Sequence, residues 1–307
     1  MEPTRERIEV RIGTRKSRLA RWQAEHVARR IEAACPGVAC RLILFETTGD
    51  RQLGRPLPAI GGKGVFTAEL EAALRDGAID LAVHSLKDLP VEEPEGLTLG
   101  AVLARADVRD ALVTRDAASL AELPAGAVVG TSSLRRSAQL LAARPDLRVE
   151  DLRGNVETRI RKVREGPYDA ALLAVAGLER LGLLDAVAER LPLDVMLPAP
   201  GQAALAVQVR AGDGEIAACV GLLDDLEARA ATTAERLFLG ALGGGCAAPV
   251  AAHATVGGGM IHLRGRVAAV DGGHLIEVAA KGARPAEVAA AAAAEAHAKG
   301  AEPLLAR

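Results

Sequence analysis

Arginines and small hydroxyl residues gather at three turns, each between a predicted strand and a predicted helix. The turns are Gly13-Thr-Arg-Lys-Ser17, Gly130-Thr-Ser-Ser-Leu-Arg-Arg136 and Leu152-Arg-Gly-Asn155. The start of a helix presents free N–H groups, and hydroxyl and guanidinium groups beside them make a good site for a carboxylate or a phosphate. Any one turn is explained equally well by solvated arginines and ordinary helix caps. The three together favour an anion-binding site.

The segment Val83-His-Ser-Leu-Lys-Asp-Leu-Pro90 follows a short predicted strand and places Lys87 beside Asp88. In a basic cleft an ionised Asp stabilises a cationic intermediate, and a protonated Asp delivers a proton to a leaving amine. Asp88 is therefore a candidate catalytic residue, although a solvated pair in a loop explains the same two residues. His84 is either a second candidate base or a packed residue.

The segment Gly243-Gly-Gly-Cys-Ala-Ala-Pro249 displays a thiol on a glycine-rich turn beyond a predicted helix. Such a turn leaves the sulfur of Cys246 accessible to an electrophile; the alternative is a small buried residue near a domain boundary. The other cysteines lie among apolar residues and are expected to be inert: Cys35, Cys40 and Cys219. Four scattered cysteines without a C-x-x-C pair do not form a disulfide framework, so we expect reduced thiols.

The run Gly61-Gly-Lys-Gly64 does not match a phosphate-binding loop. No glycine stands five positions before Gly62, and neither Ser nor Thr follows Lys63. A mobile loop that carries Lys63 over an active site is the functional interpretation, and a plain flexible loop is the alternative. The six histidines have no familiar ligand spacing, so we predict no metal.

Alternating strands and helices position these residues. The predicted strands of the first two thirds are 8–12, 41–45, 79–83, 127–130, one near Leu147, 170–175 and 203–209, and the helices between them begin near residues 19, 67, 133 and 156. This alternation predicts two α/β units with parallel or mixed sheets. Beyond the proline-rich break at 197–201, strand-like stretches at 250–256, 261–267 and 275–279 precede one Ala-rich helix. The end of the chain is therefore expected to form a small α+β domain.

Composition excludes several classes of protein. The 307 residues suit two or three domains, half of them are hydrophobic and a quarter are charged. A net charge of −2 argues against a dedicated nucleic-acid or membrane-surface binder, so an anion site must be local. No window approaches about 18 uninterrupted apolar residues, and the first residues lack the apolar core of a signal peptide. We therefore expect a cytoplasmic protein.

Together, these stretches resemble the porphobilinogen deaminase (hydroxymethylbilane synthase) family from about Ile8 to Pro249. The matching segments, in family-like order and spacing, are Thr14-Arg-Lys-Ser17, Leu19-Ala20, Trp22-Gln23, Gly61-Gly-Lys-Gly64 with Phe66, Ala82-Val-His-Ser85 with Lys87-Asp88, Gly130-Thr-Ser-Ser-Leu-Arg-Arg136, Leu152-Arg-Gly-Asn-Val156, Leu173-Ala-Val-Ala-Gly-Leu178 and Gly244-Gly-Cys246.

The resemblance implies an α/β fold with two periplasmic-binding-protein-like domains, each with a mixed sheet, and a small α+β C-terminal domain. Domain 1 would comprise residues 5–103 with 204–221, domain 2 residues 109–197, and domain 3 residues 226–307 with the cofactor-bearing cysteine loop. The return of the chain to domain 1 follows from the resemblance alone.

The resemblance also implies a transferase. The family condenses four porphobilinogen molecules head to tail, with release of ammonia, onto a dipyrromethane cofactor attached to a cysteine, which here would be Cys246. It releases hydroxymethylbilane for heme, chlorophyll or corrinoid biosynthesis. Each porphobilinogen carries an acetate and a propionate, which explains the many arginines. A monomer is implied, with porphobilinogen as its small-molecule partner, no nucleic acid or membrane partner, and transient hand-over of product to the next enzyme of the pathway.

Individual roles are carried over by position. Asp88 is expected to be catalytic, assisting deamination and stabilising the cationic intermediate. The cofactor is expected to be held by Cys246, Lys87, Asp88, Ser133, Arg135, Arg136 and Arg153. The substrate is expected to contact Arg15, Ser17, Lys63, Phe66, Arg153, Arg159 and Arg180.

Some positions depart from the family pattern, and two other classes of protein explain part of it. The departures are Arg18 for a proline, Thr48 for an arginine, Ala59 for a frequent lysine and Ala247-Ala248 for a polar segment. A non-enzymatic anion-binding protein of the same fold explains the arginines but gives no role to Cys246 or Asp88. An acyl- or phosphoryl-transfer enzyme with Cys246 as nucleophile lacks a clear Cys-His arrangement and a phosphate loop.

Overall fold

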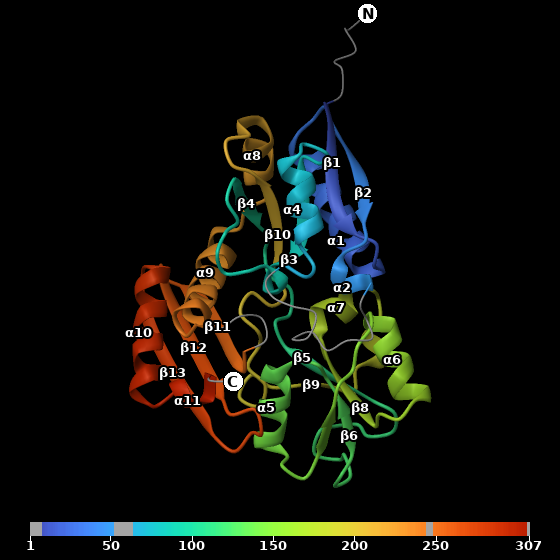
Figure 1. The fold of residues 1–307 in the computed structure, drawn as a ribbon, viewed down its shortest axis with the longest axis vertical. Helices are drawn as coiled ribbons and strands as arrows, with labels where there is room; N and C mark the ends of the chain where they lie inside the picture. Colours follow the sequence, from blue (N-terminus) through green and yellow to red (C-terminus); the bar gives the residue numbers. More distant parts are fainter. Residues whose placement is uncertain (1–7, 52–63, 244–247, 306–307) are drawn as a thin grey trace, which may run out of the picture.

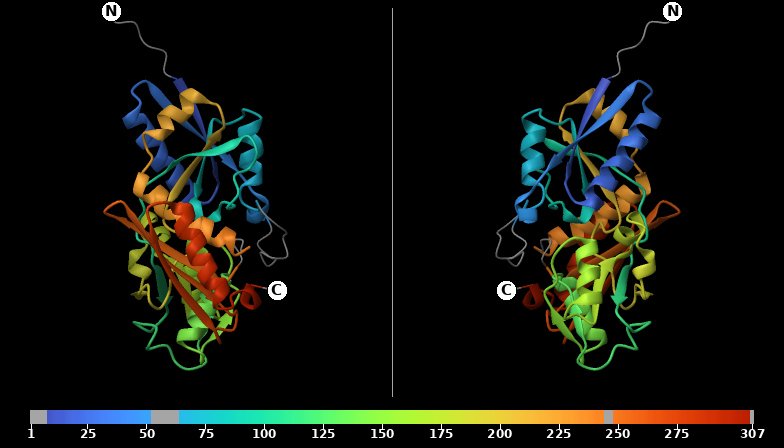
Figure 2. Two further views of the ribbon diagram at one scale, coloured as in Figure 1. Left: turned by 90° about the vertical axis from the view of Figure 1, so that its left-hand side faces the viewer. Right: turned by 90° about the vertical axis from the view of Figure 1, so that its right-hand side faces the viewer.

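Three β-sheets organise the chain in the computed structural model, which describes residues 8–51, 64–243 and 248–305. Within these residues, two sheets have five strands and one has three. Figure 1 shows the first sheet in the upper part of the molecule and the other two below it, and the side views in Figure 2 agree with this arrangement. We call each sheet, together with the helices packed on it, a unit, and we number the three units in the order in which they begin along the chain.

The first unit is a mixed sheet with the strand order β2-β1-β3-β10-β4. Its elements are β1 (Ile8–Arg15), α1 (Arg18–Ala34), β2 (Val38–Phe45), α2 (Thr48–Arg51), α4 (Ala68–Arg75), β3 (Leu81–Ser85), the short 3-10 helix η1 (Leu86–Asp88), β4 (Leu97–Val102), β10 (Leu205–Arg210) and α8 (Gly214–Gly221). Strand β1 pairs in parallel with β2 and β3, whereas β10 is antiparallel to β3 and β4. The chain thus leaves this sheet after β4 and returns to it with β10.

Amphipathic patterning holds the first unit together. Helix α1 begins at Ser17, whose Oγ accepts a hydrogen bond from the Ala20 N–H at 3.3 Å. It buries Ala24, Val27 and Ile31 in the core formed with the sheet. Burying a side chain such as Ile31 contributes about 1.5–3 kcal/mol. The helix therefore fixes the turn between β1 and its own first residue.

The second unit is another mixed sheet, with the strand order β7-β6-β8-β5-β9. Its elements are β5 (Asp110–Thr114), β6 (Val128–Gly130), α5 (Leu134–Ala143), β7 (Arg148–Glu150), α6 (Val156–Glu165), β8 (Ala170–Ala174), α7 (Val175–Arg180), the 3-10 helix η2 (Leu184–Ala186) and β9 (Glu189–Arg190). Strands β6, β7 and β8 are parallel, and β5 is antiparallel to β8. Separate apolar clusters include residues from the two faces of this sheet.

The third unit is an antiparallel sheet, β11-β12-β13, packed against helices. Its elements are α9 (Leu226–Ala241), β11 (Val250–Gly257), β12 (Met260–Ala268), β13 (Leu275–Gly282), α10 (Pro285–Ala298) and α11 (Glu302–Leu305). Phe238 of α9 is fully buried in this core. The guanidinium of Arg266 in β12 donates to Gln139 Oε1 of α5 at 2.7 Å, which fastens the third unit to the second.

Two crossovers, residues 103–109 and 191–204, join the first and second units. Arg105 in the outward crossover donates from Nε and Nη2 to the Gln202 carbonyl of the returning crossover, at 3.1 and 2.9 Å. The same guanidinium pairs with the buried carboxylate of Glu235 in α9 at 2.6 Å. One arginine therefore ties both crossovers to the third unit.

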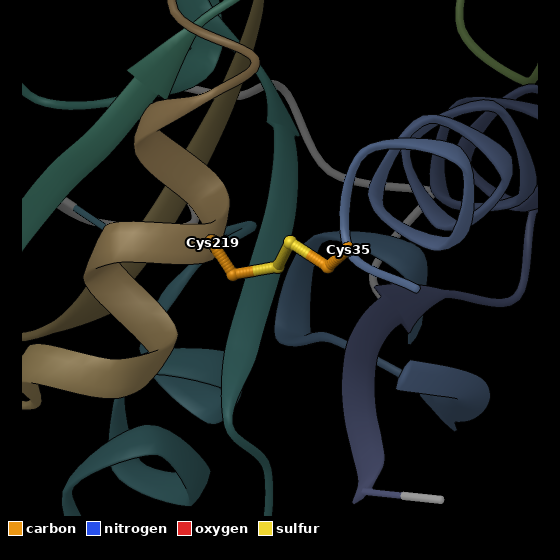
Figure 3. Close-up of a disulfide and its surroundings, with 2 residues drawn as sticks. All are labelled: Cys35 and Cys219. Carbon is orange, nitrogen blue, oxygen red and sulfur yellow. A yellow bond between two sulfur atoms is a disulfide. The ribbon is translucent and has the colours of Figure 1, made fainter. Parts of the chain in front are cut away.

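A disulfide joins Cys35, at the end of α1, to Cys219 in α8 (Figure 3). The two cysteines are 184 positions apart in sequence, and they meet because α8 and the end of α1 both pack beside the first sheet. The expectation of reduced, inert thiols is therefore wrong for this pair. Cys40 is a free thiol, and burial together with nearby Glu32 raises its pKa to about 11, so it remains protonated and unreactive.

The sheets confirm the predicted fold class, two mixed α/β units followed by a small α+β unit. Most predicted strands and helices are present within one to three residues of their expected positions. Strands β4, β5 and β9 were not predicted. Among the described residues, none of the helices has both the length and the apolar character needed to cross a bilayer.

Candidate active site

All three arginine-bearing turns follow a strand and precede a helix, as predicted: β1 to α1, β6 to α5 and β7 to α6. The second turn shows why it starts with glycine. A Cβ on Gly130 would lie 2.6 Å from Leu152 Cδ2, so a larger residue would push the second turn away from the third. Ser133 is the N-cap of α5, and Asn155 caps α6 by accepting from the Thr158 N–H at 2.8 Å. Ser133 makes no side-chain capping hydrogen bond, so close packing at Gly130 holds the second turn, and the Asn155 cap holds the third.

Arg135 and Arg136 lie side by side at the start of α5, and both pair with the same buried carboxylate, Asp110 of β5. Arg135 Nη1 donates to Asp110 Oδ2 at 2.7 Å, and Arg136 Nη2 donates to Asp110 Oδ1 at 2.6 Å. Burial opposes the ionisation of Asp110, but the two guanidinium groups outweigh burial and hold its pKa well below the usual range. The cluster has two cations for one anion.

One atom of this cluster lacks a partner. Arg135 Nε is buried and makes no hydrogen bond to any described residue, whereas Arg136 donates to Asp110 and to the Leu172 carbonyl. A buried donor without an acceptor costs about 1–3 kcal/mol. An anionic ligand in contact with Arg135 would supply the missing acceptor and balance the excess positive charge.

Arg153 and Arg159 extend the positive charge along the third turn. Both are half-buried, and Arg159 Nε donates to the Gly154 carbonyl at 2.8 Å. Burial, together with the neighbouring charges of Arg136 and Arg153, lowers the pKa of Arg159 to about 10. At neutral pH Arg159 still carries its positive charge, although its surroundings disfavour that charge. This is expected of a group that binds an anionic ligand.

Lys87 and Asp88 form the end of the 3-10 helix η1, directly after the central strand β3. Lys87 is half-buried and Asp88 is exposed. Arg236 of α9 fixes the path of this segment, since its guanidinium donates to the carbonyls of Leu89 at 3.1 Å and Pro90 at 2.6 Å. The third unit thus supports the loop that carries the candidate catalytic acid.

The ammonium of Lys87 donates to Gln202 Oε1 at 3.2 Å. Burial lowers the pKa of Lys87 to about 8, and Arg136 and Arg135 lower it while Asp88 and Asp110 raise it. Lys87 therefore titrates near physiological pH, unlike an ordinary lysine. It links the η1 segment to the arginine cluster through both charge and hydrogen bonding.

Arg15, at the end of β1, pairs with Asp50 of α2 and stacks on Phe66, whose ring centre lies 4.3 Å from the guanidinium carbon. Burial of Asp50 opposes its ionisation, but hydrogen bonds from Arg15 and Thr47 outweigh it and lower its pKa. Arg15 is thus oriented by a carboxylate of the chain itself. Ser17 serves here as the cap of α1.

Arg180, at the end of α7, faces the first unit. Its Nη2 donates to the Ala203 carbonyl at 2.7 Å, and its guanidinium carbon lies 5.9 Å from the ring centre of Trp22 in α1. Burial lowers its pKa to about 10. Arg18 adds a second contact between these units, an exposed ion pair with Glu157 at 3.5 Å. Trp22 and Arg18 of α1 and Arg180 of α7, which were singled out in the sequence, therefore lie at the junction of the two units.

Several sequence-selected residues lie elsewhere or outside the described part of the chain. His84 is a packed residue of β3, and burial lowers its pKa to about 4, so it stays neutral at physiological pH. Thr48 is hydrogen-bonded to Glu69, with its N–H and Oγ1 both at 2.8 Å from Oε1. The predictions for Lys63, Ala59, Cys246 and Ala247 fall on residues 52–63 and 244–247, which are not among those described.

Sequence reasoning missed Asp110, Gln202 and Arg236. Asp110 and Gln202 have no exposed side-chain surface, and Arg236 is buried under the η1 segment. The sequence offers no spacing signal for them, because their partners are distant in the chain. Only the geometry identifies them as parts of the same network.

Comparison with known proteins gives two family matches that together cover most of the chain. A family model described as "Porphobilinogen deaminase, dipyromethane cofactor binding domain" matches residues 10–218, and one described as "Porphobilinogen deaminase, C-terminal domain" matches residues 229–298. The first match spans the first two units, and the second lies within the third.

Curated relatives agree with these matches. The porphobilinogen deaminase of Syntrophotalea carbinolica is 51% identical over 97% of this chain and 93% of its own length, and that of Pelotomaculum thermopropionicum is 52% identical over 87% and 86%. Among solved structures, the methionine-binding protein MetQ aligns over 70% of this chain and 89% of its own, with 14% identity and a TM-score of 0.45.

Proposed function

The chain belongs to the porphobilinogen deaminase family, and from this premise we propose roles for its individual residues. It is an enzyme of that family, a transferase of tetrapyrrole biosynthesis that uses a dipyrromethane cofactor. The reaction condenses four porphobilinogen molecules head to tail with loss of ammonia and releases hydroxymethylbilane. The observation that carries the site assignment is the excess of buried guanidinium groups around Asp110, which pairs with both Arg135 and Arg136.

The residues present fit the cofactor. A dipyrromethane carries several carboxylates, and Arg135 Nε is a buried donor that lacks an acceptor among the described residues. We therefore assign Ser133, Arg135, Arg136 and Arg153 to cofactor carboxylates, with Lys87 and Asp88 beside them and Cys246 as the attachment point. When bound, this group supplies the primer to which the first substrate pyrrole is joined.

Asp88 is the residue placed to handle protons. It is exposed at the end of η1, and it lies close enough to Lys87 and Arg159 to raise the pKa of both. In this role Asp88 donates a proton to the departing amino group of porphobilinogen and then, ionised, offsets the positive charge left on the substrate.

The remaining cations bind substrate carboxylates. We assign to these carboxylates Arg15 with Ser17 and Phe66, Arg180, Arg153 and Arg159, and Lys63 is assigned with them by position. Charge-assisted hydrogen bonds between guanidinium and carboxylate are strong and directional. These residues therefore hold each incoming pyrrole in register with the proton donor.

Intact mass tests the cofactor assignment. Purified protein, denatured to remove non-covalent ligands, should exceed its sequence mass by two pyrrole units, because a thioether survives denaturation. Cys246→Ser should lack the excess, whereas Cys40→Ser, which alters the free and unreactive thiol, should keep it. If wild-type protein shows no excess before or after incubation with porphobilinogen, the attachment to Cys246 is wrong.

Steady-state kinetics test the arginine assignment. Arg159→Gln should lower kcat/KM for porphobilinogen by about 30-fold or more, since removing one partner of a buried charge pair costs about 2–5 kcal/mol. Arg164→Gln is the matched control, because Arg164 lies on the same helix, α6, but is exposed. Equal kinetics for the two variants would remove Arg159 from the substrate site.

We further propose three domains that correspond to the three units, with the boundaries 5–103 with 204–221, 109–197 and 226–307. The pairing of β10 with β3 and β4 supports the inclusion of residues 204–221 in the first domain.

We propose a cytoplasmic monomer that hands its product to the next enzyme of the pathway. Sedimentation of the purified protein tests the monomeric state.

A further inference from the structure

Gln202 occupies the point where both crossovers and the η1 segment meet. Its side chain is fully buried in the returning crossover, just before β10. A Cβ on the preceding Gly201 would lie 3.0 Å from Leu86 Cγ and 3.4 Å from the Lys87 N, so glycine is what allows this turn to approach η1 so closely. Gly201 also has a φ of +74°, which favours glycine for a second reason.

All the polar atoms of the Gln202 amide group are engaged in a defined direction. Nε2 donates to the Val108 carbonyl at 2.8 Å and to Asp110 Oδ1 at 3.0 Å, while Oε1 accepts from Lys87 Nζ at 3.2 Å. The two donors of the amide therefore face the outward crossover and the arginine cluster, and its acceptor faces Lys87. The contacts with Val108 and Asp110 fix which way the amide points.

We infer that Gln202 is a positioning residue for the reaction: its amide joins Lys87 in the first unit to the Asp110–Arg135–Arg136 cluster in the second and keeps the Lys87 ammonium beside Asp88. The inference rests on the proposed role of the Lys87–Asp88 pair. It adds a residue that touches neither the substrate nor the cofactor in the assignment above.

The charges around Lys87 give this inference a measurable consequence. The described charged groups that act on it are Arg136 and Arg135 of α5, Asp110 of β5 and Asp88 of η1. The hydrogen bond to Gln202 Oε1 favours the protonated lysine, so its loss should lower the pKa of Lys87 further below about 8. A carboxylate in place of the Gln202 amide should raise the pKa of Lys87, because a nearby negative charge stabilises the ammonium. The carboxylate should be ionised there, since the cations of the cluster outnumber its anions.

Competitive acetylation of the purified, cofactor-bearing enzyme at graded pH, read from the Lys87 peptide by mass spectrometry, measures this titration directly. Gln202→Met should move the Lys87 midpoint down by about one pH unit, which is about fivefold faster labelling at pH 7. Gln202→Glu, which preserves side-chain volume, should move the midpoint above that of the wild type. Opposite shifts from two variants at one position are not expected from general loosening of the fold.

Gln208→Met is the matched control, since Gln208 is a buried glutamine of β10 whose side chain interacts with His84. Its Lys87 midpoint should equal that of the wild type. An unchanged midpoint in both Gln202 variants, or an equal shift in the Gln208 control, overturns the inference. If the midpoints shift as expected while the pH dependence of turnover does not, Gln202 positions Lys87 but is not a positioning residue for the reaction.

Discussion

Asp88→Asn should fold normally, carry the cofactor and lose between about 10² and 10⁴ in the rate of pyrrole addition. The amide has nearly the same shape as the carboxylate but neither donates an acidic proton nor carries a negative charge, and general acid catalysis contributes about this factor. Asp88 is exposed at the end of η1, so its replacement should change the free energy of unfolding by no more than about 0.5 kcal/mol.

A single-turnover assay of ammonia release separates this effect from substrate binding. Asp116→Asn is a suitable control, because Asp116 is an exposed aspartate after β5 and has no part in the site. That variant should match the wild type. Normal elongation by Asp88→Asn would assign proton transfer to another group.

Asp110→Asn should be the most destabilising single change in the site. Asp110 is the shared partner of two buried guanidinium groups, and removal of one member of a buried charge network costs about 3–5 kcal/mol. Asparagine retains the shape and some hydrogen bonds, but Arg135 and Arg136 then face each other without a counter-charge. Urea unfolding of the two proteins at pH 7 measures the difference.

The destabilisation should depend on pH with a predictable sign. The pKa of Asp110 is lowered in the folded protein, so its contribution to stability is fully present above its unfolded pKa, about 4, and is lost as the pH falls through the folded value. The gap between wild type and variant should therefore narrow below about pH 4. Asp146→Asn, which removes an exposed partner of Arg144, should give a much smaller gap at every pH. A pH-independent gap would mean that packing rather than charge explains the loss.

The arrangement of strands and helices was largely predictable because it depends on local periodicity. The turn-helix junctions at Ser17, Ser133 and Asn155 were visible as capping residues before apolar helical spacing, and all three are helix N-caps. Strand β4 and strand β5 were missed, since residues 97–114 combine short apolar stretches with a run of charged residues. Periodicity is a weak guide in segments of this length.

The candidate site was only partly predictable, because its organisation depends on contacts between distant residues. The sequence shows two adjacent arginines at 135 and 136, but not that Asp110 lies between them and the core. It shows a Lys-Asp pair, but not that Gln202, 115 positions later, accepts from Lys87. The Cys35–Cys219 disulfide was missed for the same reason, since neither cysteine has a neighbouring partner.

The placement of β10 between β3 and β4 also determines the order in which the chain can fold during its synthesis. When β4 leaves the ribosome, the first sheet still lacks the strand that separates β3 from β4, and the entire second unit is translated before that strand emerges. The usual sequence, in which the N-terminal domain folds first, is therefore unavailable here. The second unit is therefore the first whose sheet can be completed. Until residue 210 has been made, strands β1 to β4 form an incomplete sheet, whose open edges need protection from pairing with other chains.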